Sequence, residues 1–309
     1  MGKAVAISEP ERAIMKRTIL AMLGVLVSPA LGSAQNFDNM QIRTVPVTEN
    51  IYMLQSVSGN SGGNIGVSIG DDGTFIVDDK FAPLTDKIIA AIAELTDNPV
   101  SFVVNSHFHY DHTDGNENFG RAGALIVAQD NSRRRMATDQ VLSGSNRPQP
   151  AYAEVGLPKI TFAESMTFHY NDNTIDVIHT GPGHTDGDVQ VYFRDSNVIH
   201  TGDMFVRYGL PYIDHGNGGS LDGMIDALWT IAGIIDDNTI IIPGHGQLST
   251  RTDLLEFRAM LVTIRDRIKS GIDQGLSVEQ VIASNPARGF ADPGGGTPGW
   301  VTTAYESYR

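Results

Sequence analysis

Short apolar runs, bounded by glycine and polar turn residues, occur at several places in the first 200 residues and predict β-strands. Gly70-Asp-Asp-Gly73 is predicted to be the turn between two antiparallel strands, and Asn171-Asp-Asn173 the turn of a second hairpin. The predicted strands are 49–54, 64–69, 74–77, 100–104, 125–128, 167–170 and 174–178.

Helical spacing of apolar residues replaces the strand pattern in other segments. In the segment 84–95, Leu84, Ile88, Ile92 and Leu95 recur at intervals of three or four, which places them on one face of a helix. The predicted helices are 84–95, 131–140, 221–235, 253–270 and 278–284.

Three segments are predicted to lack regular structure. The glycine-rich connection 56–63 and the stretch 141–158, which is rich in Ser, Gly, Asn and Pro, are predicted as loops. The residues after Pro286 are predicted to form a packed tail that is too small for a second domain.

The composition is that of an ordinary globular protein. The chain has 309 residues, of which 41% are hydrophobic, and it contains no internal repeat and no long linker. We therefore expect one domain from residue 35 to 309, with a short C-terminal extension from about residue 285.

The first 34 residues have the pattern of a secretory signal peptide, with Met15 as an alternative start. Lys16 and Arg17 precede a short apolar stretch at 18–27, and small residues follow it up to Ala34. About ten apolar residues are half of what a bilayer crossing needs, so no stable membrane insertion of the mature chain is expected. The sequence thus predicts a periplasmic or secreted protein.

The net charge excludes one class of partner. The formal net charge is −14, and no basic stripe interrupts the acidic surface. Such a surface repels phosphate backbones, so we expect a small-molecule substrate and no binding to nucleic acid.

The most informative segment is Asn105-Ser-His-Phe-His-Tyr-Asp-His112, in which three histidines and an aspartate lie within six residues. In an extended turn His107 and His109 point the same way and can bind one cation, while Asp111 and His112 face a point further on. One segment can therefore supply half of each site of a dinuclear hydrolytic centre.

Three later segments supply the remaining ligands, because each ends a strand-like apolar run with a histidine or carboxylate. They are Gly181-Pro-Gly-His184, Thr201-Gly-Asp203 and Pro243-Gly-His245. Strand ends that meet at one rim are rigid positions for chemistry. We predict His107, His109 and His184 on one ion, Asp111, His112 and His245 on the other, and Asp203 bridging the two.

In this order the motifs H-F-H-Y-D-H, G-P-G-H, T-G-D and P-G-H-G resemble the metallo-β-lactamase superfamily over roughly residues 47–270. The resemblance implies an α+β fold, a four-layer αββα sandwich with two metal ions at one edge between the sheets. It also implies that Asp78 fixes a ligand histidine, and that the loop 56–63 is a flap over the metals. Membership alone does not select a substrate.

One departure from the best-known β-lactamases of this fold concerns Asp203, which stands where they carry a cysteine. The chain has no cysteine, so the site contains only nitrogen and oxygen ligands and is similar to the glyoxalase II and lactonase branches. Two zinc ions are predicted, with iron or manganese as alternatives because a carboxylate is a harder ligand than a thiolate.

The predicted reaction is hydrolysis of an acyl bond. Two cations flanking one water lower its pKa towards about 7, and Asp111 is the catalytic residue that orients the resulting metal-bound hydroxide and moves its proton. A β-lactam is the leading substrate, which would imply a role in antibiotic resistance, because export suits it and Arg207 could hold its carboxylate. His215 is a second candidate for substrate contact, since its loop follows Asp203.

Two alternatives remain open from the sequence. A lactonase or a glyoxalase II-like thioesterase fits Asp203 better than a β-lactamase does, although the chain lacks an evident separate helical domain for glutathione. A mononuclear iron persulfide dioxygenase is the rival from another reaction class.

Overall fold

The computed structural model describes residues 37–57, 62–143 and 146–309. The chain divides into two compact units, Met1–Gln35 and Asn36–Arg309, and all described residues belong to the second. The predicted signal segment 1–34 and residues 58–61 of the predicted flap 56–63 lie outside the described residues.

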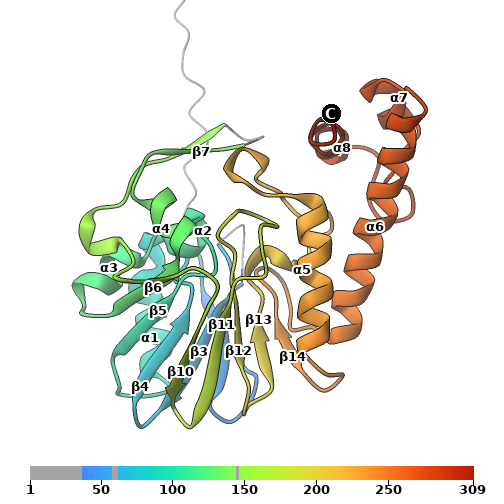
Figure 1. Cartoon of the computed structure of the whole chain (residues 1–309). Helices are drawn as coiled ribbons and strands as arrows, with labels where there is room; N and C mark the ends of the chain where they lie inside the picture. Colours follow the sequence, from blue (N-terminus) through green and yellow to red (C-terminus); the bar gives the residue numbers. More distant parts are fainter. Residues whose placement is uncertain (1–36, 58–61, 144–145) are drawn as a thin grey trace, which may run out of the picture. The chain divides into compact units, whose positions relative to one another are not determined.

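The first sheet has seven strands in the order β1-β2-β3-β4-β5-β6-β9 (Figure 1). β1 to β4 pair antiparallel in sequence order, whereas β5, β6 and β9 extend the sheet as parallel strands. The strands are β1 (Ile42–Pro46), β2 (Ile51–Ser56), β3 (Ile65–Gly70), β4 (Gly73–Val77), β5 (Val100–Val104), β6 (Leu125–Gln129) and β9 (Ile160–Phe162). Because β4, β5 and β6 are parallel, their carboxyl ends meet at one edge of the sheet.

The second sheet has five strands in the order β10-β11-β12-β13-β14. β10 (Ser165–Tyr170) and β11 (Asn173–Ile178) form a hairpin whose turn residues Asn171 and Asp172 have φ of 54° and 53°, a left-handed conformation that Asn and Asp tolerate. β12 (Gln190–Phe193) and β13 (Val198–His200) continue antiparallel, and β14 (Ile240–Ile242) pairs parallel with β13.

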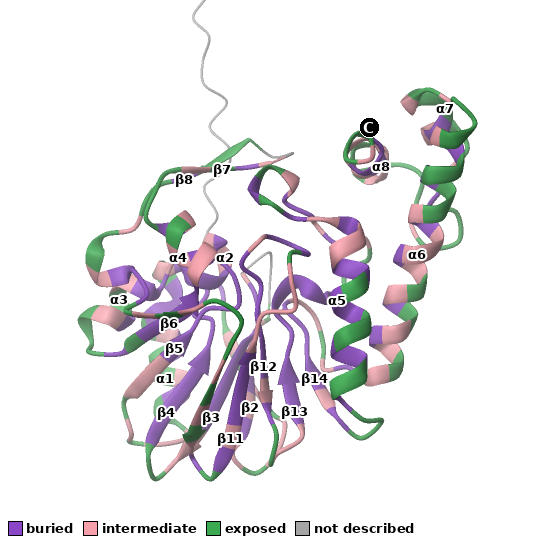
Figure 2. Cartoon of the chain, viewed as in Figure 1, coloured by how far each residue is buried: buried purple, intermediate pink, exposed green. Residues whose placement is uncertain are grey.

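The two sheets pack face to face and helices cover their outer faces, which gives four layers. The core between the sheets includes Phe75 and Val104 from the first sheet and Val177 and Phe193 from the second. α1 (Thr85–Ala93) packs its apolar face on the first sheet, and α5 (Leu221–Ile234) and α6 (Arg251–Asp273) cover the second. Buried residues follow these interfaces in Figure 2. The predicted αββα sandwich is confirmed.

The remaining helices are short or lie at the C-terminal end. They are α2 (Tyr110–Thr113), α3 (Asn116–Arg121), α4 (Asp130–Met136), α7 (Val278–Ala283) and α8 (Thr297–Glu306). Within the described ranges, no helix combines the length and the apolar character that a membrane crossing requires.

The prediction of an irregular loop at 141–158 is wrong in part. It contains β8 (Arg147–Gln149), which pairs with β7 (Gln140–Leu142) in a small separate sheet. The helix that was predicted at 131–140 ends at Met136, and Gln140 already belongs to β7. Three-residue strands of mixed polarity carry too little periodicity to be recognised.

The predicted C-terminal tail contains one regular element. Residues 297–306 form α8, which buries Val301, Ala304 and Tyr305 against α6 and α7. The glycines and prolines ahead of it hide the helical pattern, and Pro298 is tolerated because it lies in the first turn.

Candidate metal centre

The predicted ligands lie at the rim where strands of both sheets end. His107 follows β5 by three residues, Asp203 follows β13 by three, and His245 follows β14 by three. His184 lies in the loop between β11 and β12. Parallel pairing of β13 with β14 brings two of these ends together, because the carboxyl ends of parallel strands share an edge.

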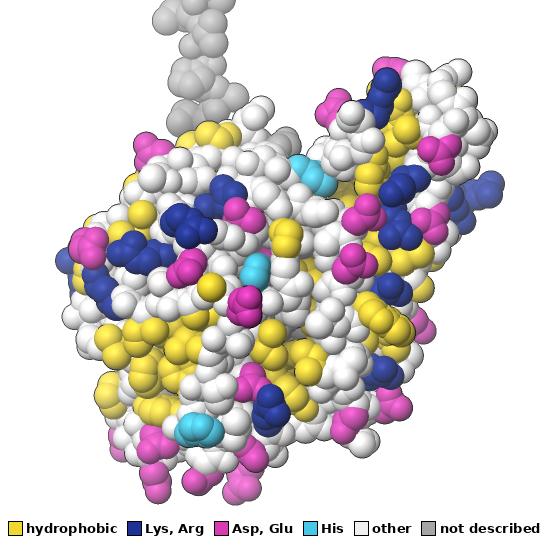
Figure 3. All heavy atoms as spheres, in the orientation of Figure 1, with side chains coloured by type: hydrophobic (Ala, Val, Ile, Leu, Met, Phe, Trp, Pro, Cys, Tyr) yellow, Lys and Arg dark blue, Asp and Glu magenta, His cyan; other side chains and the backbone are white. Residues whose placement is uncertain are grey.

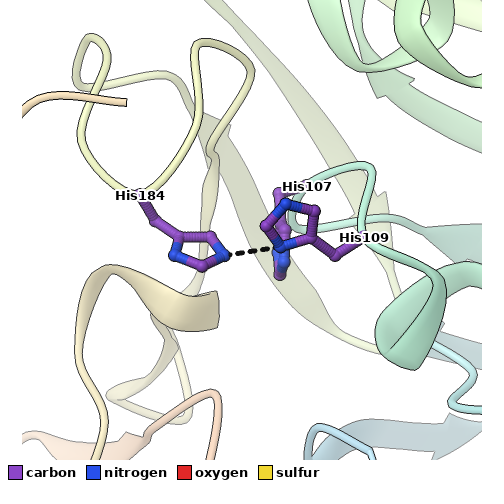
Figure 4. A group of neighbouring side chains, drawn as sticks. All are labelled: His107, His109 and His184. Carbon is purple, nitrogen blue, oxygen red and sulfur yellow. Dashed lines mark hydrogen bonds between the residues drawn. The ribbon is translucent and has the colours of Figure 1, made fainter. Parts of the chain in front are cut away.

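The first group consists of His107, His109 and His184, whose rings point toward one another (Figure 4). One ligand nitrogen from each lies within 4.8 Å of the others. His109 Nδ1 is 2.8 Å from His184 Nε2. All three side chains are buried, and His107 Nε2 has no hydrogen-bond partner among the described residues. A buried nitrogen without a partner is costly unless it serves as a ligand.

The second group consists of Asp111, His112 and His245. His245 Nε2 lies 3.4 Å from Asp111 Oδ2 and 3.3 Å from His112 Nε2. Asp203 lies between the groups: its Oδ1 is 3.2 Å from His112 Nε2, and its Oδ2 is 3.7 Å from His184 Nε2. The seven predicted residues, here called the cluster, therefore form two half-sites that share the Asp203 carboxylate.

Asp78 holds the second group in place. Its buried carboxylate accepts hydrogen bonds from the Ser106 amide at 2.6 Å and the Ser106 hydroxyl at 2.7 Å. His112 Nδ1 is 2.7 Å from Asp78 Oδ2, so a proton on Nδ1 leaves Nε2 with its lone pair toward the cluster. Asp78 itself has φ of 66°, an uncommon backbone conformation that aspartate tolerates better than most residues.

Asp214 does for the first group what Asp78 does for the second, and the sequence did not single it out. Its Oδ2 is 2.9 Å from His109 Nε2, which leaves Nδ1 of that ring to face the cluster. Ser143 and Asn217 donate to the Asp214 carboxylate at 2.6 and 2.8 Å. The one feature of the sequence that could have indicated Asp214 is its position beside His215, in the loop after Asp203.

Electrostatics differ between the two groups. Burial, reinforced by the neighbouring His109, lowers the pKa of His184 to about 4, and burial also holds the pKa of His107 well below its usual range. These rings are therefore neutral and have a free lone pair at neutral pH.

The second group instead attracts positive charge. Burial alone would lower the pKa of His112, but Asp203, Asp78 and Asp111 outweigh it and raise that pKa well above its usual value. The same holds for His245. Burial would lower its pKa, but Asp203 and Asp111 outweigh that effect and raise the pKa to about 9. A cation is thus favoured at this point between the three carboxylates.

Two glycines are required where loops approach the cluster. A Cβ at Gly63 would lie 2.0 Å from His112 Cε1, and one at Gly244 would lie 2.0 Å from Asp203 Oδ1. Any larger residue at either position would displace a side chain of the cluster.

A cavity of about 500 Å³ opens above the cluster, here called the metal cavity. Besides cluster residues it is lined by Phe81, Tyr110, Leu142, Arg147, Tyr208 and Tyr212. Arg147, on β8, extends over the Tyr110 ring at 5.2 Å from its centroid and is the cation among these lining residues.

The two predicted substrate contacts lie elsewhere. Arg207 does not line the metal cavity: its Nη1 is 3.1 Å from Asp253 Oδ1 on α6, and it lines a separate cavity beside that helix. His215 lines a third cavity, next to α8. Neither Arg207 nor His215 is among the residues that line the metal cavity.

Donor chemistry also fits metal ions. The groups offer imidazole nitrogens and carboxylate oxygens only, a set that suits zinc, iron and manganese and that lacks soft thiolates. Together with the unpartnered His107 Nε2, this set supports metal binding by both groups.

Comparison with known proteins gives a consistent result. The sequence model of the metallo-beta-lactamase superfamily matches residues 59–245, which are more than half of the chain. A curated relative, the hydroxyacylglutathione hydrolase of Rhodospirillum rubrum, is 27% identical over 164 residues, which are 52% of this chain and 54% of that protein. The chain thus matches about half the length of this relative.

Solved structures with the same fold include two metallo-β-lactamases. The one from Pontibacter korlensis has a TM-score of 0.60 at 18% identity and covers 72% of this chain and 99% of its own. DIM-1 has a TM-score of 0.57 at 21% identity, with 72% and 98% covered. A variant of the sec-alkyl sulfatase PisA1 reaches 0.67 at 16% identity, covering 86% of this chain and 50% of that chain.

Proposed function

Because the chain belongs to the metallo-beta-lactamase superfamily, we propose that it is a dinuclear metal hydrolase that cleaves the acyl bond of a small ester-type molecule, a lactone or thioester. The observation that carries the proposal is the position of Asp203, whose two oxygens face the two half-sites at 3.2 and 3.7 Å. A carboxylate between two cation sites can bind both ions of a dinuclear hydrolytic centre.

We propose that His107, His109 and His184 hold one ion and that Asp111, His112 and His245 hold the other, with zinc as the native metal. When bound, two such ions polarise a carbonyl and lower the pKa of a water at neutral pH.

The protein's own groups would then position the reactants. The Asp111 side chain is 22% exposed and faces the metal cavity, so it can accept a proton from a water there and return it to the leaving group. Asp78 and Asp214 keep the His112 and His109 rings in fixed tautomers through their hydrogen bonds. Tyr110 and Phe81 contribute aromatic side chains to the wall of the cavity.

Three observations favour an ester-type substrate over the β-lactam that the sequence suggested first. Arg207, the expected anchor of a β-lactam carboxylate, is already paired with Asp253. The curated relative is a hydroxyacylglutathione hydrolase, and the site has no cysteine. A β-lactam remains the second candidate because Arg147 lines the metal cavity and could hold a carboxylate there.

A substrate panel tests the proposal. The zinc-loaded protein should hydrolyse an acyl-homoserine lactone or a thioester faster than a chromogenic cephalosporin, and His107→Ala should abolish every activity. A panel in which only the cephalosporin is cleaved would overturn the ester proposal. Oxygen consumption with a persulfide after iron loading would instead identify a dioxygenase.

Arg147 and Arg207 separate the two candidates at the level of single residues. If a substrate carboxylate is held in the metal cavity, Arg147→Ala should lower kcat/KM for carboxylate-bearing substrates by about 10- to 150-fold, the loss of one charge-assisted hydrogen bond, while neutral lactones are unaffected. Arg207→Ala is the matched control, because that guanidinium pairs with Asp253 outside the cavity. If steady-state kinetics instead show the larger loss of kcat/KM in Arg207→Ala, Arg207 holds the substrate carboxylate, as the sequence suggested.

We also propose that the protein is exported, on the strength of the sequence pattern at residues 16–34. Sequencing the amino terminus of the protein recovered from the periplasm should give a chain that begins near Gln35. Recovery of the uncut chain from the cytoplasm would contradict export.

A further inference from the structure

We propose that a second cavity, between the segment 208–213 and α8, binds the apolar, uncharged part of the substrate that does not react. We call it the C-terminal cavity. The proposal rests on the proposed function and deepens it, because it assigns the substrate class: an ester, lactone or thioester that carries a neutral hydrocarbon acyl group of medium length.

The C-terminal cavity has the size and chemistry of a ligand site. Its volume is about 700 Å³, within the range of roughly 300–1,000 Å³ that small-molecule sites occupy. Apolar side chains form much of its wall, namely Leu210, Pro211, Ile213, Phe290, Ala291 and Trp300. In Figure 3 the surface is hollowed between the C-terminal helices and the body of the protein.

The cavity adjoins the metal cavity. Tyr208 and Tyr212 line both of them, so the two spaces meet at these two side chains. The Tyr212 ring lies 5.7 Å from the rings of His109 and of His184, measured between centroids, and the Tyr208 ring lies 5.6 Å from that of His245. Tyr208 is 54% exposed, so a substrate chain can cross its ring. A molecule whose carbonyl lies at the cluster can therefore extend over the tyrosines into the second space.

Hydrogen bonds fix the walls of this cavity. Trp300 Nε1 donates to the Pro211 carbonyl at 2.7 Å, which ties α8 to the segment 208–213. The Tyr212 hydroxyl donates to the Ser143 carbonyl, which ties together two further lining residues. Outside the cavity, the Tyr305 hydroxyl anchors α8 by donating to the Leu276 carbonyl at 2.8 Å. A preformed apolar space beside the reaction centre suits a ligand, since binding then requires little rearrangement.

The charges of the lining disfavour an anionic occupant. Asp292 is the charged side chain that lines the C-terminal cavity, and His215 is its titratable neighbour, whose pKa burial holds below the usual value. An uncharged imidazole and a carboxylate give no attraction to anions. A peptide-like group with several carboxylates therefore fits worse than a hydrocarbon chain. In this arrangement His215 would contact the remote part of the substrate.

Binding can be measured without catalysis, because the chain has two tryptophans and one of them lines the cavity. The Trp229→Phe variant leaves Trp300 as the single fluorophore, and the Trp300→Phe variant leaves the exposed Trp229 as the control. Both are titrated with N-decanoyl-homoserine and N-butanoyl-homoserine, which contain no lactone to hydrolyse. Each buried methylene is worth up to about fourfold in affinity, so the decanoyl compound should bind Trp229→Phe at least roughly tenfold more tightly and shift Trp300 emission to the blue. Equal affinity for both compounds, or a shift that Trp229 reports equally, would overturn the proposal.

Filling the cavity provides the second test. A Cβ at Gly299, on α8, meets nothing within 4 Å, so Gly299→Phe can project into the cavity without a backbone clash. Gly233→Phe is the matched control, because Gly233 is also an exposed helical glycine with open space, on α5 and outside the cavity. Only Gly299→Phe should reduce the preference of kcat/KM for decanoyl- over butanoyl-homoserine lactone, by at least about tenfold, because it removes space that only the longer chain occupies. An unchanged preference, or a new oligomeric state in Gly299→Phe alone, would show that the cavity serves another purpose.

The two proposals fail in different ways. If no acyl substrate is hydrolysed but Trp300 still reports chain-length-dependent binding, the cavity assignment stands and the proposed reaction falls. If lactones are hydrolysed without any dependence on chain length and Trp300 is silent, the hydrolase stands and the cavity assignment falls.

Discussion

Asp203→Ala is expected to lower kcat/KM on every hydrolysed substrate by at least about 10³-fold and to reduce the metal content below two ions per chain. Asp203 is the carboxylate between the half-sites, 3.2 Å from His112 Nε2 and 3.7 Å from His184 Nε2. Its loss removes an anionic ligand from both sites and leaves two cations to repel each other. Metal ions supply several kcal/mol of transition-state stabilisation in such centres, and about 4 kcal/mol corresponds to that loss of rate.

The control for Asp203→Ala is Asp237→Ala, at an aspartate whose side chain is 85% exposed and whose partner is Arg251. The control should keep both ions and full activity, measured by elemental analysis and steady-state kinetics on the same preparations. Full metal content and activity in Asp203→Ala would show that the carboxylate does not join the two sites.

Asp78→Ala is expected to destabilise the metal-free protein by about 3–5 kcal/mol, a fall in Tm of at least roughly 6 °C in a domain of this size. The side chain is buried, and its removal leaves the Ser106 amide, the Ser106 hydroxyl and His112 Nδ1 without their acceptor. Alanine also tolerates φ of 66° less well than aspartate. Thermal unfolding in the presence of a chelator measures this effect apart from metal binding.

Asp78→Asn separates the two functions of this residue. Asparagine fits the same backbone conformation and keeps one acceptor oxygen, so it should recover much of the stability. It cannot supply the negative charge that His112 faces, and we expect affinity for the second ion to remain about 10- to 100-fold lower. Unfolding of Asp78→Ala at the temperature of the unaltered protein would show that Asp78 is not a structural anchor.

The candidate ligands could be predicted from the sequence because four short motifs carry them. His107, His109, Asp111 and His112 are local neighbours, and a run of this kind has few uses other than metal binding. The outer layers were predictable for a similar reason, since α1 and α5 have apolar faces that can be recognised from their own sequences.

What could not be predicted depends on contacts between segments that lie far apart along the chain. The bond between Asp214 and His109 joins residues 105 positions apart, and no local pattern indicates it. Arg207 was chosen for its distance from Asp203 along the sequence, whereas Asp253 on α6 decides where its side chain lies. Arg147 escaped attention because its three-residue strand has no periodicity of its own.

The most direct test of the dinuclear hydrolase is a titration of the metal-free protein with zinc, in which bound metal and hydrolysis of the preferred acyl substrate are followed together. We expect that two ions bind per chain, that full activity requires the second, and that His107→Ala and His245→Ala each retain at most one. Full activity at one ion per chain, with no further binding, would contradict this expectation.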